Sequence, residues 1–449
     1  MVSTTTSKVL ISFFFALALL SAKAQPAGGQ TFRDSLARLV EASPVFSGIF
    51  TGFYLYDPER DTVIYEKDAD KYYTPASNTK LFTFYTALKL LGDSLHVGRY
   101  VQQGDTTILW GAANPVLLHP DLPHDSTIYD RLRELPGALF YSDFNFEEDR
   151  FGPGWSWRDY QYYYQAERSP MPLYGNAIRF MREGAGTGFQ VVPELFDDAL
   201  EYDETLDNRR PRILRRENEN FFTFNTAAMM GGEFEEEKPF HSSAALTAQL
   251  LEAALDRPVG VLDPTFYRLP TVHTLAIPTP DTLYRRLMKD SDNFIAEQLL
   301  LMVSDKLFGV QSTDLAIDYA TYNLYREAPD ELVWADGSGL SRYNLFTPRT
   351  VAHVLKLIRE ELPAEKIYDI FPAGGVSGTI EAWYGDEDET PYIYAKTGTL
   401  SNKHCLSGYL LTRSGKTLIF SFMHNNFING TNEVKREMER VLAYIRDAG

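Results

Sequence analysis

The chain has a single cysteine, Cys405, in 449 residues, so it cannot form a disulfide within itself. We expect Cys405 to be a small buried residue in a strand. Histidines are few as well, and the eight present form no H-E-x-x-H or His-x-His pattern. His119 and His124 lie in a proline-containing stretch without that spacing. We therefore predict no metal site and no cofactor.

Basic residues are outnumbered, with 43 Lys and Arg against 61 Asp and Glu and a formal net charge of −18. Such a balance argues against nucleic acid and anionic membrane surfaces as partners. An anionic substrate would have to be met by local positive charge.

Long apolar runs are also scarce, and the clearest one, at residues 9–20, lies near the amino terminus. Lys8 precedes it, and Ala-Lys-Ala at residues 22–24 offers the small residues typical of a cleavage site. Residues 1–24 therefore predict a secretory signal peptide; the alternative is a transmembrane anchor, for which the run is short. We expect an exported, periplasmic chain, soluble or peripheral, with no integral membrane segment after processing.

What the sequence does contain is three short motifs: Ser-Asn-Thr-Lys at residues 77–80, Ser-Asp-Asn at 291–293 and Lys-Thr-Gly-Thr at 396–399. Each alone is common by chance, as a helix cap, a solvated lysine or the end of a strand. In this order they resemble the Ser-x-x-Lys, Ser-Asp-Asn and Lys-Thr-Gly set of penicillin-binding proteins and serine β-lactamases.

Local patterns place the first motif on regular structure. Residues 48–56 and 62–67 read as strands joined by a turn, and residues 78–91 read as a helix that ends at a glycine. Ser77 then begins a helix, and Lys80 lies one turn later on the same face.

The carboxyl-terminal third reads as helices followed by strands. Residues 293–303 predict a helix with one apolar face, and residues 392–400 predict a strand that carries the third motif. Residues 406–411 and 417–423 predict a hairpin, and residues 432–447 a closing amphipathic helix. We therefore expect an α+β fold with an antiparallel sheet built from both ends of the chain.

The long stretch between the first two motifs exceeds what a compact β-lactamase-like domain needs. It is rich in aromatic residues and lacks low complexity, so we interpret it as an inserted module and not a linker. The predicted domains are a signal peptide at 1–24, a discontinuous catalytic domain at 25–95 and 271–449, and an inserted, β-rich module at 96–270 with room for two subdomains. The acidic run at 386–389 is expected to be a solvated loop.

The first and third motifs could together activate a nucleophile. A Ser77 hydroxyl needs a base in contact with it, and Lys80 can be that base if its pKa is lowered. Burial beside Lys396 would lower it through desolvation and like-charge repulsion. The backbone N–H groups of Ser77 and Thr399 are candidates for an oxyanion hole, in which one donor is worth roughly 10²–10³ in rate.

The remaining motif residues have predicted roles in proton transfer and binding. Ser291 would relay a proton to the leaving group, and Asn293 would hold the substrate amide and Lys80. The residues predicted to bind the terminal carboxylate of a substrate belong to the third motif: Lys396, Thr397, Gly398 and Thr399.

Two further segments restrict the resemblance to one group among these proteins. Residues 336–344 read Asp-Gly-Ser-Gly-Leu-Ser-Arg-Tyr-Asn, and residues 152–159 read Gly-Pro-Gly-Trp-Ser-Trp-Arg-Asp, followed by Tyr-Tyr-Tyr-Gln-Ala at 162–166. With them the chain resembles, over about residues 45–440, the D-alanyl-D-alanine carboxypeptidase/endopeptidases among low-molecular-mass penicillin-binding proteins. The resemblance implies a transpeptidase-like domain with a five-stranded antiparallel sheet, and a serine peptidase that β-lactams acylate and that cleaves peptidoglycan stem peptides through Ser77.

The resemblance also implies two specificity residues. Arg342 matches an arginine that helps to hold the carboxylate-bearing side chain of the stem peptide, and Asp143 loosely matches an aspartate that meets the ammonium of that side chain. The chain departs from the family's pattern at Ala-Asn-Pro, residues 113–115, and at Gly-Val-Ser-Gly-Thr, residues 375–379. Two alternatives stay open: a β-lactamase or esterase, and a non-catalytic peptidoglycan-binding protein.

Overall fold

The structure is a computed structural model that describes residues 27–123, 126–184, 188–264, 271–385, 390–428 and 430–449. The predicted signal peptide, His124 and the acidic run at 386–389 lie outside the described residues.

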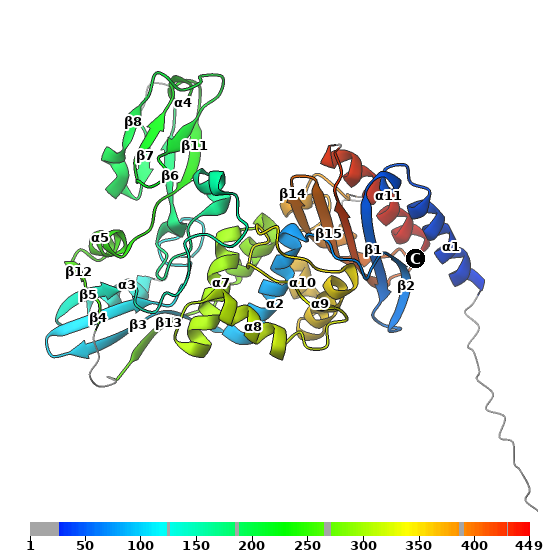
Figure 1. Ribbon diagram of the computed structural model, residues 1–449, viewed down its shortest axis with the longest axis horizontal. Helices are drawn as coiled ribbons and strands as arrows, with labels where there is room; N and C mark the ends of the chain where they lie inside the picture. Colours follow the sequence, from blue (N-terminus) through cyan, green and yellow to red (C-terminus); the bar gives the residue numbers. More distant parts are fainter. Residues whose placement is uncertain (1–26, 124–125, 185–187, 265–270, 386–389, 429) are drawn as a thin grey trace, which may run out of the picture.

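A five-stranded sheet in the order β14-β15-β16-β1-β2 forms the centre of one half of the molecule. Every neighbouring pair in it is antiparallel. Its strands are β1 (Phe50–Asp57), β2 (Thr62–Lys67), β14 (Ile393–Leu400), β15 (Lys403–Leu411) and β16 (Thr417–Asn425). Since β1 lies beside β16, both ends of the chain build this sheet (Figure 1), which confirms the predicted fold.

One face of this sheet is covered by the two terminal helices, α1 (Ala27–Glu41) and α11 (Thr431–Ala448) (Figure 1). Side chains alternate along a strand, so Phe53 and Leu55 point to the same face. They are fully buried and share one core with side chains of α1 and α11. The predicted closing helix therefore anchors the sheet.

The other face packs on a helical layer whose core includes the fully buried Cys405 of β15. The helices of this layer are α2 (Thr79–Leu91), α6 (Asp281–Arg285), α7 (Asn293–Phe308), α8 (Thr313–Asn323), α9 (Pro348–Glu361) and α10 (Ala364–Ile370). The prediction of a single apolar face for the helix at 293–303 is wrong. Every residue of α7 from Phe294 to Asp305 is buried, because the helix lies inside the layer, and a helix in that position is covered all round.

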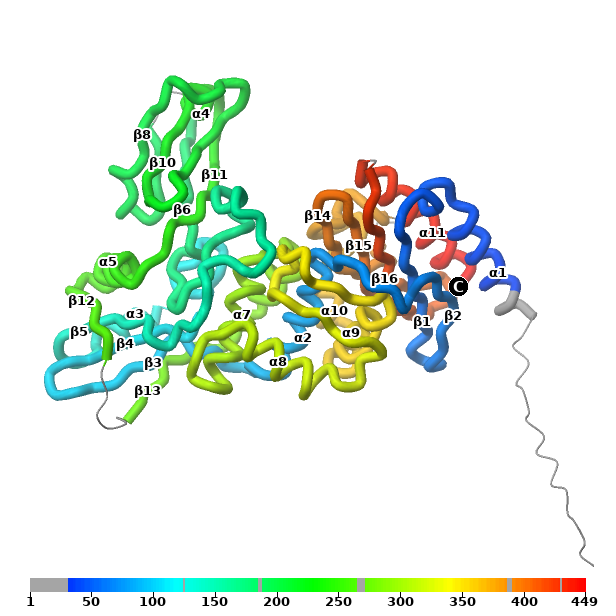
Figure 2. The backbone as a smooth tube through the Cα atoms, viewed as in Figure 1, coloured from blue at the N-terminus to red at the C-terminus, as the bar shows by residue number. Residues whose placement is uncertain are grey.

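Between α2 and α6 the chain forms a second half with its own sheets (Figure 2). The larger sheet has the order β12-β5-β4-β3-β13. Its strands are β3 (Ser94–Gln103), β4 (Thr106–Gly111), β5 (Ala138–Ser142), β12 (Val259–Val261) and β13 (His273–Pro278), and α3 (Ser126–Arg133) and α5 (Ala244–Leu255) accompany them. Because β3 pairs with β13, this sheet extends a few residues beyond both predicted boundaries of the insertion, 96 and 270.

Two small sheets form a lobe above the larger one, in the orders β11-β6-β7 and β8-β10-β9 (Figure 1). Their strands are β6 (Ala177–Arg182), β7 (Gln190–Val192), β8 (Leu200–Tyr202), β9 (Ile213–Arg215), β10 (Phe222–Phe224) and β11 (Phe234–Pro239), with the short helix α4 (Thr226–Met229). Phe180 and Phe222, both fully buried, join this lobe to a core that continues into the helical layer. The insertion is thus packed on the half of the molecule that contains the helical layer and the first sheet.

Candidate active site

The first motif forms a tight turn that is tied to the sheet by the side chain of Asn78. Ser77 lies in the 3₁₀ turn Ala76–Asn78, which leads directly into α2. The fully buried Asn78 donates from Nδ2 to the carbonyl oxygen of Lys396 at 2.8 Å, and its Oδ1 accepts from Ser407 Oγ at 2.7 Å. The turn that carries Ser77 is therefore held against β14 and β15.

Two glycines allow backbone to approach this turn from both sides. A Cβ on Gly398 would lie 2.4 Å from the carbonyl oxygen of Pro75 and 3.0 Å from the amide nitrogen of Ser77. On the other side Gly339 has a φ of +84°, and a Cβ there would lie 1.9 Å from the carbonyl oxygen of Ala76. A larger residue at either position would push its backbone away from the turn that carries Ser77.

Lys80 lies beside Ser77 and is fully buried. Its Nζ is 3.0 Å from Ser77 Oγ and donates to Asn293 Oδ1 and to the carbonyl oxygen of Ser338, both at 2.6 Å. Asn293 in turn donates from Nδ2 to the carbonyl oxygen of Tyr164 at 2.8 Å, which brings the insertion into the site. The first two motifs therefore meet at the amine of Lys80.

Both lysines of the motifs have lowered pKa values. Burial is the main cause for Lys80 and lowers its pKa to about 8, although the neighbouring carboxylates Asp336, Glu297 and Asp292 partly oppose that change. Burial also holds the pKa of Lys396 well below its usual value, and repulsion by Lys80 adds to the effect. A lysine with a pKa near 8 is neutral often enough at neutral pH to accept a proton.

Lys396 joins the second and third motifs. Its Nζ donates to Ser291 Oγ at 2.8 Å and to the carbonyl oxygen of Thr397 at 3.0 Å. The hydroxyl of Thr397 donates to Thr379 Oγ1 at 2.7 Å. Thr379 belongs to the segment at 375–379 in which the chain departs from the family's pattern, so that segment contacts β14, the strand that carries the third motif.

A cleft with a volume of about 780 Å³ opens beside these groups. The predicted site residues that line it are Ser77, Ser291, Asn293, Thr399 and Arg342. The insertion contributes residues to the opposite side, among them Ser156, Asp159, Tyr163, Tyr164 and Tyr174. The structure therefore brings the three motifs, Arg342 and the insertion to one cavity.

Asp143 is not among the residues that line this cleft. It is half-buried directly after β5, where its carbonyl oxygen accepts the amide of Phe146 at 2.9 Å. The prediction that Asp143 meets the substrate rested on a loose match between the chain and the family. The position of Asp143 in the structure does not support that prediction.

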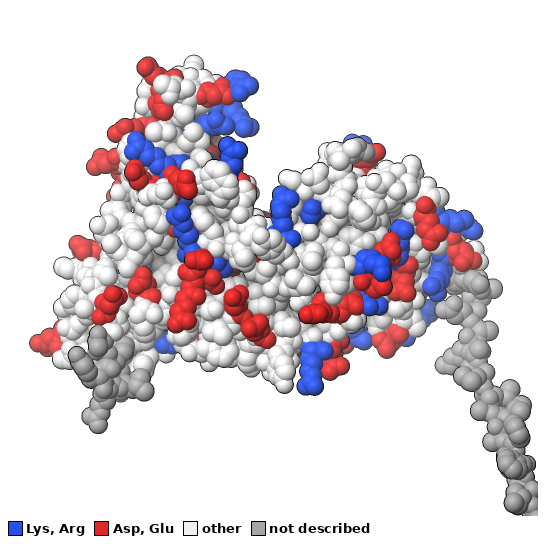
Figure 3. All heavy atoms as spheres, in the orientation of Figure 1, with Lys and Arg blue, Asp and Glu red and all other residues white. Residues whose placement is uncertain are grey.

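A chain of ion pairs connects the second motif with the insertion. Arg286 pairs with Asp292 and with Asp121, each at 3.0 Å, and Asp121 also pairs with Arg179 of β6 at 2.9 Å. Asp292 additionally caps α7 by accepting the amide of Ile295 at 2.9 Å. On the face drawn in Figure 3, basic side chains lie on both sides of the indentation between the insertion and the main sheet, although the molecule as a whole is acidic.

The segment at 336–344 is organised around the fully buried Asp336. Its carboxylate accepts the amides of Gly339 and Ser341 at 2.8 and 2.6 Å, and the side chain of Asn344 at 2.7 Å. Trp155, from the insertion segment at 152–159, donates its indole N–H to the same carboxylate at 2.8 Å. The two segments that carried the family resemblance are therefore in direct contact.

A metal site is not evident in the part of the chain that the structure describes, where no group of three or more His, Cys, Asp and Glu side chains is placed to hold an ion. His119 does line the cleft, and burial lowers its pKa to about 4. Within the same described ranges, no helix is long and apolar enough to cross a bilayer.

A comparison with protein-family models identifies the family of this chain. Residues 32–193 and 275–447 match the model of the D-Ala-D-Ala carboxypeptidase 3 (S13) family. The chain belongs to this family. The predicted family and the predicted enzyme class, a serine peptidase, are thereby confirmed, and the predicted carboxypeptidase or endopeptidase function agrees with them.

Comparisons of this S13 peptidase with individual proteins support the same family. The D-alanyl-D-alanine carboxypeptidase of Actinomadura sp. (strain R39) is 27% identical over 440 residues, which are 88% of this chain and 80% of that protein. D-alanyl-D-alanine carboxypeptidase DacB of Haemophilus influenzae is 29% identical over 178 residues, only 38% of this chain and 37% of that protein. The crystal structure of penicillin binding protein 4 from H. influenzae matches with a TM-score of 0.71 at 20% identity, covering 92% of this chain and 98% of that one, which confirms the predicted fold.

Sequence reasoning did not identify several residues that hold the site. Asn78 occupies a variable position of the first motif, where nothing in the pattern indicates a hydrogen bond to a strand far along the chain. Asp336 stood in a recognised segment without a predicted role. Glu297 and Arg168 looked like ordinary helix and loop residues, and only their complete burial in the structure singles them out.

Proposed function

We propose that the chain is an exported, periplasmic serine DD-peptidase that cleaves the terminal D-alanine from stem pentapeptides, or the D-alanyl cross-link between stem peptides, through an acyl-enzyme on Ser77. The observation that carries the proposal is the position of Lys80, a fully buried amine with a pKa of about 8 that lies 3.0 Å from Ser77 Oγ. A base with these properties is what a serine hydroxyl needs to become a nucleophile.

In the acylation step, neutral Lys80 takes the proton from Ser77 Oγ while Oγ bonds to the carbonyl carbon of the penultimate D-alanine. The negative charge that develops on the carbonyl oxygen is met by the backbone N–H groups of Ser77 and Thr399. Losing one such donor typically costs roughly 10²–10³ in rate.

The tetrahedral intermediate then collapses as the C–N bond breaks. The leaving amine takes up the proton that Lys80 received, with Ser291 as the relay, because Ser291 lines the same cleft as Ser77 and its hydroxyl accepts from Lys396 Nζ at 2.8 Å. Water attacks the resulting ester with Lys80 again as the base. The products are the shortened peptide and free Ser77.

Substrate carboxylates are bound by positive charge in an otherwise acidic protein. We assign the terminal carboxylate to Lys396, Thr397 and Thr399 of β14, with Gly398 providing the close approach. Arg342 lines the same cleft and is assigned to an acidic group on the stem peptide.

β-Lactams should acylate the same serine. A crystal structure of penicillin binding protein 4 from H. influenzae, which shares this fold, is complexed with a β-lactam. In this chain the geometry at Ser77 and Lys80 would serve the opening of a lactam ring as it serves a peptide, since both reactions are acyl transfers.

The test is to follow the intact mass of the mature protein after benzylpenicillin is added, and the release of D-alanine from a stem pentapeptide. A lasting one-to-one adduct and D-alanine release, both absent in Ser77→Ala, are expected. D-alanine release that survives Ser77→Ala would overturn the proposal. Rapid loss of the adduct with consumption of the drug would instead indicate a β-lactamase.

A further inference from the structure

A buried carboxylate, Glu297, lies behind the predicted base. It follows Asn293 by one turn of α7, so the two side chains share a face of that helix. Glu297 Oε1 accepts the amide of Ser338 at 2.7 Å, and the carbonyl oxygen of Ser338 accepts from Lys80 Nζ at 2.6 Å. One residue, Ser338, therefore stands between the carboxylate and the amine.

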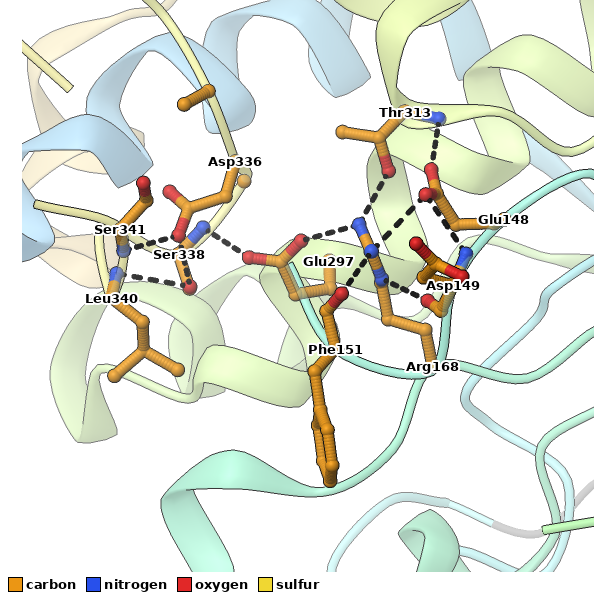
Figure 4. Close-up of polar contacts among 12 residues, drawn as sticks. Glu148, Asp149, Phe151, Arg168, Glu297, Thr313, Asp336, Ser338, Leu340 and Ser341 are labelled. Atoms are coloured by element: carbon orange, nitrogen blue, oxygen red, sulfur yellow. Dashed lines mark hydrogen bonds and ion pairs between the residues drawn. The ribbon is translucent and has the colours of Figure 1, made fainter. Parts of the chain in front are cut away.

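The second oxygen of Glu297 faces the insertion. Among the described residues Oε2 has no hydrogen-bond partner, and it pairs with the guanidinium of Arg168, whose Nη1 lies 3.8 Å away. Figure 4 draws Ser338 and Arg168 on opposite sides of this carboxylate. Both charged side chains are about 1% exposed, so water does not screen them.

Arg168 is itself held in place by the insertion and by the start of α8. Its guanidinium donates to the carbonyl oxygens of Asp149 and Phe151, both in the insertion, at 3.0 and 2.9 Å. It also donates to the hydroxyl of Thr313 at 3.0 Å and pairs with the carboxylate of Glu148 at 3.1 Å. The position of the cation beside Glu297 is thus set by the inserted module together with the first residue of α8.

We propose that Glu297 is a positioning residue for Lys80: Arg168 of the insertion holds its carboxylate, the carboxylate holds Ser338, and its charge state controls how readily Lys80 gives up a proton. The inference rests on the proposed function, because it takes Lys80 as the base of Ser77. It gives the inserted module a part in setting the reactivity of the nucleophile.

The electrostatics around both groups give the direction of the effect. Burial and the neighbouring Asp336 raise the pKa of Glu297 to about 7, while Arg168 and the amide of Ser338 oppose that rise. Lys80 faces the carboxylates of Glu297, Asp336 and Asp292 and the amine of Lys396.

When Glu297 takes up a proton, Lys80 loses one of three negative charges that favour its ammonium form. Below about pH 7, Lys80 is therefore neutral more often than it would be beside a permanently charged carboxylate. Protonation of Glu297 therefore extends to lower pH the range in which Lys80 can act as the base.

The decisive variant is Glu297→Gln, which keeps an oxygen for the amide of Ser338 and removes the charge. The second-order rate of acylation by benzylpenicillin is measured from pH 5 to 10 by intact mass. We expect the acid limb of the profile to move to lower pH by roughly half a unit to one unit. A role in structure alone would lower the rate equally at every pH.

Glu439→Gln is the matched control. Glu439 lies on α11, on the far side of the main sheet, and its carboxylate also accepts a backbone amide, that of Tyr384, at 2.6 Å. We expect the acid limb of this variant to stay where it is in the parent protein. An equal displacement in both variants would show a general effect of charge and would overturn the proposal.

Arg168→Gln provides an independent second variant if Glu297→Gln does not fold. Removing the cation favours the neutral form of Glu297, so the acid limb should move in the same direction. A uniform loss of rate without displacement, or failure of both variants to fold, would assign the pair to the stability of the fold and overturn the proposal. If the parent protein itself forms no adduct with benzylpenicillin, the proposed function is wrong. If the parent forms the adduct but the acid limb does not move in the variants, only the role of Glu297 is wrong.

Discussion

Lys396 Nζ donates to Ser291 Oγ at 2.8 Å, and this hydrogen bond joins the third motif to the second. Lys396 comes from β14, and Ser291 precedes α7, on the side where the insertion enters the site. The second and third motifs are therefore one unit in space, although about a hundred residues separate them in the chain.

Replacing Lys396 by methionine should separate activity from stability. The variant keeps the apolar stem but loses the bond to Ser291 and the amine that we assign to the substrate carboxylate, so acylation by benzylpenicillin should fall by at least about 10²-fold. Thermal unfolding should occur at the same or a higher temperature, because a fully buried amine is exchanged for an apolar group. Lys89→Met, at a partly exposed ion pair of α2, is the control and should leave the rate unchanged. A Lys396→Met protein that reacts at the parent rate would contradict the assignment.

The acylation rate should depend on the ionisation of Lys80. The neutral form is the base, so the rate should rise with pH up to the pKa of about 8 and level off above it. At pH 7 about one molecule in ten then carries a neutral Lys80, against about one in three thousand for a lysine at its ordinary pKa. Stopped reactions analysed by mass between pH 6 and 9.5 give the profile. A rate that is level across this range would rule out Lys80 as the titrating base.

Asn78→Ala should weaken both the fold and the site. The change leaves the carbonyl oxygen of Lys396 and the hydroxyl of Ser407 without this partner inside the protein, so the free energy of unfolding should fall by about 1–3 kcal/mol. The nucleophile turn also loses its tie to β14, and acylation should slow. Asn323→Ala removes an exposed amide from α8 and should change stability by less than about 0.5 kcal/mol. Urea unfolding of both variants makes the comparison, and equal losses would argue against a special role for Asn78.

Gly398→Ala should increase the distance between the third motif on β14 and the turn that carries Ser77. The added methyl group would meet backbone atoms of Pro75 and Ser77 at 2.4 and 3.0 Å, so β14 must shift away from the turn. A displacement of about 1 Å at a reacting group can cost roughly 10² in rate. Gly48→Ala, where nothing lies within 4 Å of the new methyl group, is the matched control and should keep its activity. Retention of full acylation in Gly398→Ala would show that the strand tolerates the shift.

Much of the architecture near the ends of the chain could be predicted from local patterns. The strands at β1 and β2, the hairpin of β15 and β16 and the closing helix α11 all follow from alternation, turn residues and helical periodicity. The interior position of α7 could not be predicted in this way, because burial on all sides depends on neighbours from distant parts of the chain. The sheet that extends past both predicted ends of the insertion is a further example, since its outer pairing joins β3 to β13.

The sequence by itself determined the chemistry available to this protein: a serine, two lysines and their partners in three ordered motifs, and the segments that relate the chain to a peptidase family. Which of these groups meet was decided by the tertiary structure. Folding buries Lys80 and lowers its pKa, and it places Arg342, but not Asp143, in the lining of the cleft. It also sets Glu297 and Arg168 behind the base. The physical reason is that pKa values and reactivity depend on burial and on charges a few ångströms away, and those distances exist only once remote segments have packed together.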